Sequence, residues 1–350
     1  MRVNQTSSKA LIVSLILLVL VGCQPLTTLP TPYTPPIAHG SPTPIPPTGT
    51  IYFPEPIPTQ SPTAVKEPQD SATLTTNPIP QDTQTPEPQV IRIAVIGDYG
   101  SGEQAEQDVA DLVLSWNPDL IITTGDNNYP DGAAETIDEH IGKYYHSYIH
   151  PYKGAYGEGA DQNRFFPTLG NHDWRSINAG PYLEYFTLPG NERYYDVDLG
   201  FVHLFALDSD SNEPDGVGSS SLQALWLQEK LRTSDAPWKI VYMHHPPYSS
   251  GTHGPVGWTR WPYAEWGAST VISGHDHTYE RILVDGIPHF VNGLGGGAIY
   301  RFENIMEGSQ MRYNGDYGAM LVEATPDQLT FQFINRYGEL IDTYSLGDSP

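Results

Sequence analysis

Short apolar runs rich in β-branched residues alternate with amphipathic stretches along residues 90–350, and this pattern predicts an α/β domain. Residues 90–96 and 120–124 have the composition of buried strands. Between them, apolar side chains from Val109 to Trp116 recur at helical spacing, and Ser101-Gly102-Glu103-Gln104 has the spacing of a capping box. This strand–helix–strand start predicts a parallel, right-handed crossover with loops gathered at the carboxyl ends of the strands.

The later part of the chain repeats the pattern with more strands. We predict them at residues 164–169, 193–198, 201–207, 238–243 and 270–273, then around 321, at 331–334 and at 340–344. A helix capped by Ser220-Ser221 is predicted to run to about Leu231, with Leu222, Leu225 and Trp226 on its buried side. Strands early, helices between and hairpins late predict two packed mixed sheets with helices outside.

The chain opens with the pattern of an export signal. Arg2 and Lys9 precede a largely apolar run at residues 11–21, which is shorter than the roughly 20 residues of a bilayer-spanning helix. We interpret residues 1–22 as a signal peptide. Leu20-Val21-Gly22-Cys23 resembles a bacterial lipobox, so Cys23 is predicted to be lipidated and to anchor the exported protein outside the cell membrane or outer membrane. The alternative is an ordinary signal peptide with a cysteine near its cleavage site.

Residues 23–89 are predicted to form a disordered stalk rich in proline and threonine. The stretch from 24 to 90 holds 18 of the 33 prolines and few charges, and no apolar period runs through it. Such a composition cannot bury a core and favours extended, polyproline-like chain. The folded domain is therefore assigned to residues 90–350. Cys23 is the only cysteine, so no internal disulfide is expected.

The net charge argues against one class of partner. It is −24 for the whole chain and becomes −26 without residues 1–22, which hold two basic residues and no acids. No basic run is present to follow a phosphate backbone, so we expect no nucleic acid partner. The sequence predicts no protein partner either. An anion-binding site in so acidic a protein must be made locally, with metal.

Five motifs place oxygen or nitrogen ligands directly after apolar runs. They are Gly97-Asp98-Tyr99-Gly100, Gly125-Asp126-Asn127-Asn128-Tyr129, Gly170-Asn171-His172-Asp173, Val241-Tyr242-Met243-His244 and Gly274-His275-Asp276-His277. The candidate ligands are Asp98, Asp126, Tyr129, Asn171, His244, His275 and His277. Two metal ions need such a set, including a carboxylate that bridges them. Each motif alone is a common turn, whereas five in order at strand ends predict one site.

The ordered set resembles the metal site of the purple acid phosphatases, within the calcineurin-like metallophosphoesterase superfamily. The resemblance also includes Asn127-Asn128-Tyr129-Pro130 and Thr278-Tyr279-Glu280-Arg281. It implies a four-layer αββα sandwich of two mixed β-sheets flanked by helices. It further implies that Asp126 bridges two ions, with Asp98, Tyr129 and His277 on one ion and Asn171, His244 and His275 on the other.

Tyr129 and Gly100 narrow the resemblance. A phenol has a pKa near 10, so binding as phenolate near neutral or acid pH requires a strongly acidic cation. This favours Fe(III) beside a second, divalent metal (Fe, Zn or Mn). Many other superfamily members carry Asp-x-His in the first motif, and Gly100 stands where that histidine would be. The loss of that histidine, with Tyr129 as the replacement ligand, separates purple acid phosphatases from the phosphodiesterase and phosphoprotein phosphatase branches.

By the same resemblance, His172 and His253 are catalytic and face the phosphate or the leaving oxygen, where a protonated imidazole would speed cleavage. Asp173 stands where the family usually has glutamate, and we expect it to make a shorter supporting contact. His245 is interpreted as a structural neighbour of the site rather than a ligand. Residues 293–297 lack the lysine and helix of a nucleotide-binding loop and are predicted to form a tight loop near the metals.

The resemblance implies an exported, lipid-anchored acid phosphatase that hydrolyses small phosphate monoesters by attack of metal-bound hydroxide. One alternative is a phosphodiesterase or nucleotide hydrolase on the same scaffold. Another is a stalked surface binding protein whose site is vestigial. The complete ligand set and the two additional histidines favour an enzyme.

Overall fold

The computed structural model describes residues 89–347. The predicted signal peptide, Cys23 and the predicted stalk up to residue 88 lie outside the described residues. Among the described residues, no helix has the length and apolar character that crossing a membrane requires.

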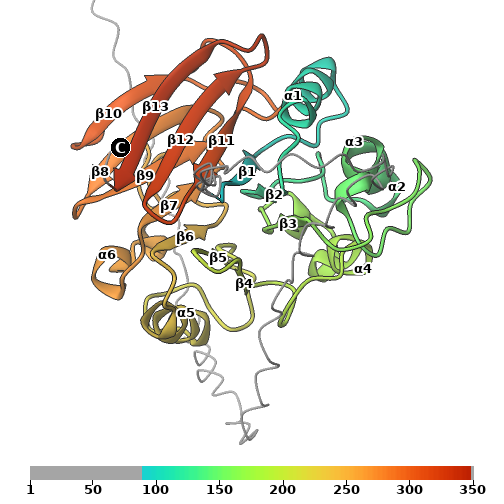
Figure 1. The fold of residues 1–350 in the computed structure, drawn as a ribbon. Helices are drawn as coiled ribbons and strands as arrows, with labels where there is room; N and C mark the ends of the chain where they lie inside the picture. Colours follow the sequence, from blue (N-terminus) through green and yellow to red (C-terminus); the bar gives the residue numbers. More distant parts are fainter. Residues whose placement is uncertain (1–88, 348–350) are drawn as a thin grey trace, which may run out of the picture. The chain divides into compact units, whose positions relative to one another are not determined.

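Two mixed β-sheets pack against each other at the centre of the described domain (Figure 1). The first sheet has six strands in the order β13-β12-β11-β1-β2-β3, and the second has seven in the order β10-β8-β9-β7-β6-β5-β4. The bounds in the first sheet are β1 Ile91–Ile96, β2 Leu120–Thr123, β3 Phe165–Pro167, β11 Gly318–Ala324, β12 Gln328–Asn335 and β13 Leu340–Gly347. Those in the second are β4 Tyr195–Asp198, β5 Val202–Ala206, β6 Trp238–Tyr242, β7 Thr270–Ser273, β8 Tyr279–Val284, β9 Ile287–Asn292 and β10 Ser309–Tyr313.

Helices flank both sheets, which confirms the expected four-layer αββα sandwich. The α-helices are α1 Gln104–Ser115, α2 Ala134–Ile137, α3 Lys143–Tyr145, α4 Gly180–Tyr185, α5 Leu222–Thr233 and α6 Tyr263–Trp266. Shorter 3₁₀ or π turns are η1 Asp138–Gly142, η2 His146–Tyr148, η3 Asp173–Arg175, η4 Ile177–Ala179 and η5 Gly257–Thr259. In Figure 1, α1 to α4 lie beside the six-stranded sheet, and α5 and α6 beside the seven-stranded one.

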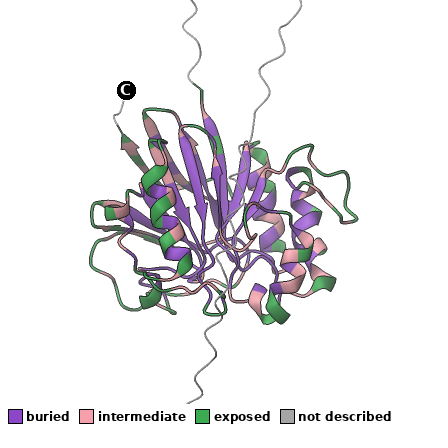
Figure 2. Cartoon of the chain, turned by 90° about the horizontal axis from the view of Figure 1, so that it is seen from below, coloured by how far each residue is buried: buried purple, intermediate pink, exposed green. Residues whose placement is uncertain are grey.

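Apolar side chains of the central strands point alternately to the two faces of their sheet and so pack against both neighbouring layers. In β5 and β6, Leu204 and Ile240 belong to the core shared by the two sheets, whereas Phe205 and Val241 pack with Leu227 of α5. Successive strand side chains point to opposite faces, so one run of apolar residues serves both interfaces. Figure 2 shows the buried strands between helices whose outer faces are exposed.

Parallel pairing places the loops that carry the motifs at common sheet edges. β1, β2 and β3 are parallel neighbours, as are β5, β6 and β7. The carboxyl ends of parallel strands lie on one side of their sheet, which is where ligands bind in open α/β folds. Motifs that are far apart in sequence therefore meet in space.

The predicted buried side of α5 was wrong in part. Leu222 and Leu225 are 64% and 53% exposed, and Gln223 is buried in their place. The Gln223 side chain accepts from the backbone N–H of Asp208 at 2.8 Å and donates to its carbonyl at 2.8 Å. Two tertiary hydrogen bonds to one polar side chain thus set the rotation of this helix, which apolar spacing alone does not reveal.

The capping box expected at the start of α1 is also absent. Ser101 donates its hydroxyl to the carbonyl of Gly296 at 2.9 Å, and the N-cap residue Glu103 makes no side-chain cap. Instead, the Glu106 carboxylate accepts from the backbone N–H of Gly102 at 2.7 Å. The serine ties the helix start to the glycine-rich loop because that loop lies directly against it in the tertiary structure.

Candidate metal centre

Three of the predicted ligands occupy a backbone conformation that non-glycine residues rarely adopt. Asp98 after β1, Asp126 after β2 and His275 after β7 have φ values of 55°, 52° and 70°. Such left-handed residues are costly and persist where the surrounding structure over-determines them, often at functional sites. The sequence motifs gave no sign of this shared conformation.

One group of donors gathers around the Tyr129 hydroxyl. Its oxygen lies 3.0 Å from Asp126 Oδ2, 3.4 Å from Asp98 Oδ1 and 3.0 Å from His277 Nε2. Ligand atoms of the two carboxylates and His277 lie within 4.8 Å of one another. The four side chains predicted for one ion therefore converge.

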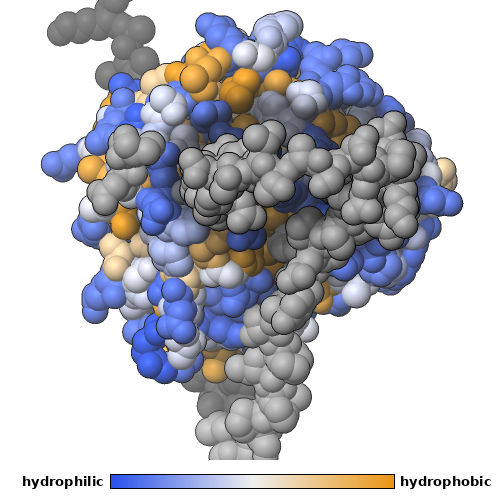
Figure 3. Space-filling view, viewed as in Figure 1, coloured by the Kyte–Doolittle hydropathy of each residue, from blue (hydrophilic) through white to orange (hydrophobic). Residues whose placement is uncertain are grey.

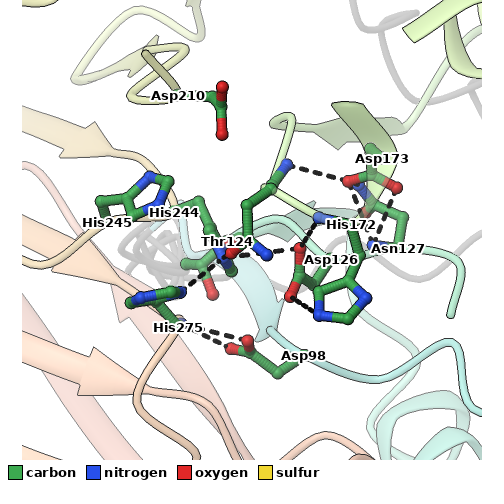
Figure 4. A network of polar contacts seen from close by, with 12 residues as sticks. Asp98, Thr124, Asp126, Asn127, His172, Asp173, Asp210, His244, His245 and His275 are labelled. Atoms are coloured by element: carbon green, nitrogen blue, oxygen red, sulfur yellow. Dashed lines mark hydrogen bonds and ion pairs between the residues drawn. The ribbon is translucent and has the colours of Figure 1, made fainter. Parts of the chain in front are cut away.

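A second group gathers around His244 at the end of β6. His244 Nε2 lies 3.1 Å from His275 Nδ1 and 3.0 Å from Asn171 Oδ1. It is also 3.5 Å from Asp126 Oδ1, while the other oxygen of that carboxylate faces Tyr129. Asp126 thus lies between the two groups, where a bridging carboxylate would have to be. Figure 4 shows Asp126, His244 and His275 entering one space from separate loops.

Backbone carbonyls fix the tautomers of two histidines in the form that binds metal. His244 Nδ1 lies 2.9 Å from the Thr124 carbonyl, and His277 Nδ1 lies 2.5 Å from the Ala298 carbonyl. A carbonyl only accepts, so each Nδ1 donates its proton and each Nε2 directs a lone pair into the cluster. His244 Nε2 then faces the Asn171 oxygen, and two acceptors at this distance need a cation or a proton between them. The donor set therefore fits a metal pair.

The charges around Tyr129 bear on the kind of metal. Burial, together with the Asp98 and Asp126 carboxylates, raises the pKa of Tyr129 well above its usual value near 10. The free phenol is therefore neutral and donates to Asp126. Burial by itself lowers the pKa of His244, but the Asp126 and Asp98 carboxylates outweigh it and raise that pKa. Cations bound by these donors would have to displace these protons.

The two predicted catalytic histidines lie on the rim of the cluster. The His172 ring packs 4.4 Å from the Tyr129 ring, and its Nε2 is 3.9 Å from Asp126 Oδ2. The exposed His253 ring stacks on His275 with centroids 4.4 Å apart and an interplanar angle of 26°. Both imidazoles border the space into which the donors point.

Asp276 holds the loop of His253, a role that the motif did not suggest. The buried carboxylate accepts from the backbone N–H groups of His253 at 2.8 Å and Gly254 at 3.0 Å, and from the Ser249 hydroxyl at 2.5 Å. The residue between the two histidine ligands of the fifth motif therefore fixes the loop above them. Only its place between His275 and His277 in the sequence offered a clue.

Tyr300 is a second residue that the sequence did not indicate. Its ring stacks on His277 with centroids 4.1 Å apart and an interplanar angle of 6°, and it meets His253 edge-on at 5.3 Å. It follows the glycine-rich segment 293–297, whose Gly297 donates its N–H to the Asp98 carbonyl at 2.8 Å. The structure thus places that segment against the centre.

Asp173 makes the supporting contact expected of it. Its buried carboxylate accepts from the backbone N–H of Gly170 at 2.8 Å and from the Asn127 side-chain amide at 2.9 Å. Burial and the nearby Asp126 carboxylate raise the pKa of Asp173 to about 7. The contact ties the third motif to the second.

Hydrophilic residues cover much of the visible face in Figure 3, with smaller apolar patches between them.

Comparisons with known proteins agree with the motifs. The family model described as calcineurin-like phosphoesterase matches residues 91–279. Purple acid phosphatase 3 of Arabidopsis thaliana is 25% identical over 285 residues, which cover 72% of this chain and 76% of the relative. Tartrate-resistant acid phosphatase type 5 of Mus musculus is 22% identical over 313 residues, which cover 76% of this chain and 92% of the relative. These matches confirm the resemblance to the purple acid phosphatases.

A solved structure shares the fold. The purple acid phosphatase from yellow lupin seeds superimposes with a TM-score of 0.60 at 17% identity. The match covers 75% of this chain but only 54% of the lupin chain, so this chain spans about half of that relative.

Proposed function

Because the chain belongs to the calcineurin-like phosphoesterase family, we propose that it is an acid phosphatase of the purple acid phosphatase type, acting on phosphate monoesters. The Tyr129 hydroxyl carries this proposal, since it lies among Asp98, Asp126 and His277. The first motif supports it, because a Cβ atom on Gly100 would lie 1.9 Å from the Asn127 carbonyl oxygen. A histidine ligand has no room at that position.

The donor set would hold Fe(III) on the side of Tyr129 and a divalent ion (Fe, Zn or Mn) on the side of His244. When bound, such a pair clamps the phosphoryl oxygens and lowers the pKa of water so that hydroxide is available as the nucleophile. The raised pKa of Tyr129 supports the assignment of iron, because only a strongly acidic cation would take the phenol proton near neutral or acid pH.

The protein's own groups then bind the phosphate and handle the proton of the leaving group. His253 is exposed, and its backbone N–H is fixed on Asp276, so its ring stays above His275. As an imidazolium it would protonate the leaving oxygen, a contribution of about 10²–10⁴-fold. His172 places Nδ1 2.5 Å from the Pro130 carbonyl, which leaves its Nε2 for contact with a bound phosphoryl group.

The test combines spectroscopy with a pair of substrates. Purified protein should show a visible band from tyrosinate-to-iron charge transfer and contain two metal ions, one of them iron. It should hydrolyse p-nitrophenyl phosphate faster than bis-p-nitrophenyl phosphate. A colourless oxidised protein that prefers the diester would overturn the proposal in favour of a phosphodiesterase, and a protein with neither metal nor turnover would be a binding protein.

We further propose that the enzyme is exported and anchored through lipid on Cys23, so that it acts on small phosphorylated compounds outside the cell. The support is the lipobox-like segment alone. In a bacterial host, the wild type should incorporate labelled palmitate and partition into membranes. Cys23→Ala should do neither, and equal labelling of both would refute the anchor.

A further inference from the structure

His245 lies at the centre but is not among its seven predicted donors. It follows His244 in the loop after β6, is 7% exposed, and its ring is 4.9 Å from that of His244 and 4.5 Å from that of His275. The three imidazoles each offer a nitrogen, and these nitrogens lie within 4.8 Å of one another. A buried polar ring in this place needs a chemical role.

Ser209 determines which nitrogen of His245 carries the proton. The serine Oγ accepts the backbone N–H of His245 at 2.8 Å and lies 3.1 Å from its Nδ1. Within the described part of the chain, the hydroxyl proton of Ser209 has no other acceptor at hydrogen-bond distance. It is therefore donated to Nδ1, which leaves the ring proton on Nε2.

This tautomer makes His245 a donor and not a ligand. Nε2 with a proton has no lone pair for a metal, in contrast to Nε2 of His244, whose Nδ1 donates to Thr124. His245 Nε2 makes no hydrogen bond to any described residue. The two adjacent histidines thus have opposite tautomers, one accepting toward the cluster and one donating.

The ring of His245 is also held in place from its outer side. Trp258 lies with its ring 6.0 Å from His245, and its indole N–H donates to the Ser209 carbonyl at 3.1 Å. Ser209 therefore fixes both the tautomer of His245 and the aromatic neighbour that packs on it. A donor held this firmly loses little entropy when it binds an anion.

We propose that His245 is a third substrate-binding imidazole, whose Nε2–H donates to a non-bridging oxygen of the phosphoryl group, and that Ser209 is its positioning residue. This inference rests on the proposed function. A phosphate dianion is the ligand that fits, because it offers several acceptors and would be held by the metals beside His244 and His275. Hydrogen bonds to charged groups are worth more than neutral ones, so the expected effect is about 10- to 100-fold in phosphate affinity.

The experiment compares phosphate binding with metal content in purified, metal-loaded protein. His245→Phe keeps an aromatic ring but removes the donor, and His245→Gln keeps an N–H donor at similar reach. We expect His245→Phe to retain two metal ions by mass spectrometry and to raise the dissociation constant for inorganic phosphate about 10- to 100-fold by calorimetry. His245→Gln should recover part of the affinity.

Ser209 provides the test of the tautomer. Ser209→Ala should weaken phosphate binding several-fold with unchanged metal content, and Ser209→Thr, which keeps the hydroxyl, should restore it. His289→Phe is the matched control, since His289 is also a buried histidine but lies in β9, where its ring faces Tyr248 and Tyr263. It should leave phosphate affinity unchanged.

Two results would overturn the inference. Loss of one metal ion in His245→Phe would make His245 a ligand, and unchanged phosphate affinity would make it structural. Neither depends on turnover. If the wild type binds phosphate but hydrolyses no monoester, the proposed function fails while the role of His245 is still decided by these measurements.

Discussion

The backbone N–H of Tyr129 donates to the carbonyl of Gly100 at 2.7 Å. The residue that supplies a phenol to the centre is thereby bonded to the glycine that stands where related enzymes have a histidine ligand. A Cβ on Gly100 would also collide with the Asn127 carbonyl, at 1.9 Å. The absence of a side chain at Gly100 and the position of the Tyr129 phenol thus depend on the same backbone packing.

Gly100→Ala should therefore damage the metal site although it removes no donor. The new methyl group must displace the backbone between Asn127 and Tyr129. We therefore expect the free energy of unfolding to fall by about 1–3 kcal/mol and the metal content to fall. Urea unfolding and metal analysis measure both. Gly218→Ala is the control, because a Cβ there meets nothing within 4 Å. Full metal content in Gly100→Ala would show that the segment tolerates the shift.

Tyr129→Phe should abolish the visible band and lower kcat/KM by at least about tenfold. The hydroxyl is the atom that contacts Asp98, Asp126 and His277, and its loss removes an anionic ligand. The measurements are the absorption spectrum and steady-state kinetics. The partly buried Tyr194, whose hydroxyl bonds to Asp215 outside the centre, offers Tyr194→Phe as the control. A colour that survives in Tyr129→Phe would assign the band to another group.

Asp276→Ala should lower kcat by about 10²-fold while both metals remain bound. The change leaves the His253 and Gly254 amides and the Ser249 hydroxyl without their acceptor, so the His253 imidazole loses its position. In a double mutant with His253→Ala, the two effects should not add, because both act through one imidazole. Ser249→Ala removes one of the three contacts and should cost much less. Additive losses would show that Asp276 acts independently of His253.

Titration of Glu106 should make the free energy of unfolding depend on pH. Burial raises the pKa of this carboxyl from 4.5 to about 8. The folded state therefore binds more protons than the unfolded state between these values, and the free energy of unfolding falls as pH rises through this window. At about 1.36 kcal/mol per pKa unit, the loss is roughly 5 kcal/mol.

Glu106→Gln should remove this part of the pH dependence, because a neutral amide has no proton to lose. Urea unfolding at pH 5 and pH 8 measures the difference, and the variant should exceed the wild type in stability at pH 8. Glu103→Gln, at an exposed position beside the same helix, is the control. Identical slopes for Glu106→Gln and the wild type would mean that the carboxyl titrates normally.

Removing metal should destabilise the domain. Without cations the centre brings two carboxylates, a phenol and three imidazoles close together. Metals that bind only the folded state stabilise it by about 2.7 kcal/mol at a concentration 100 times the dissociation constant. Chelator should lower Tm, and Fe and Zn should restore it. A His275→Ala, His277→Ala double variant should show no such shift, and an equal shift would point to metal bound elsewhere.

Much of this molecule follows from its sequence, because local pattern reports local structure. Apolar runs that end at Gly-Asp or Gly-His indicate strands whose next residues lie at a sheet edge, and parallel strands bring such edges together. The two mixed sheets and the resemblance carried by the five motifs were therefore predictable. The replacement of a histidine ligand by Gly100 and the additional donor from Tyr129 were also visible, since both depend only on which residues are present.

The tertiary structure decided what depends on partners distant in sequence. Gln223 is buried because Asp208 lies opposite it. Ser101 bonds to the glycine-rich loop and does not cap the helix, because that loop lies within hydrogen-bond distance. The proton positions of His244 and His245 follow from the Thr124 carbonyl and the Ser209 hydroxyl, which no sequence spacing connects to them. Sequence supplies the donor atoms, whereas the hydrogen bonds made on folding determine where each atom points and which nitrogen holds its proton.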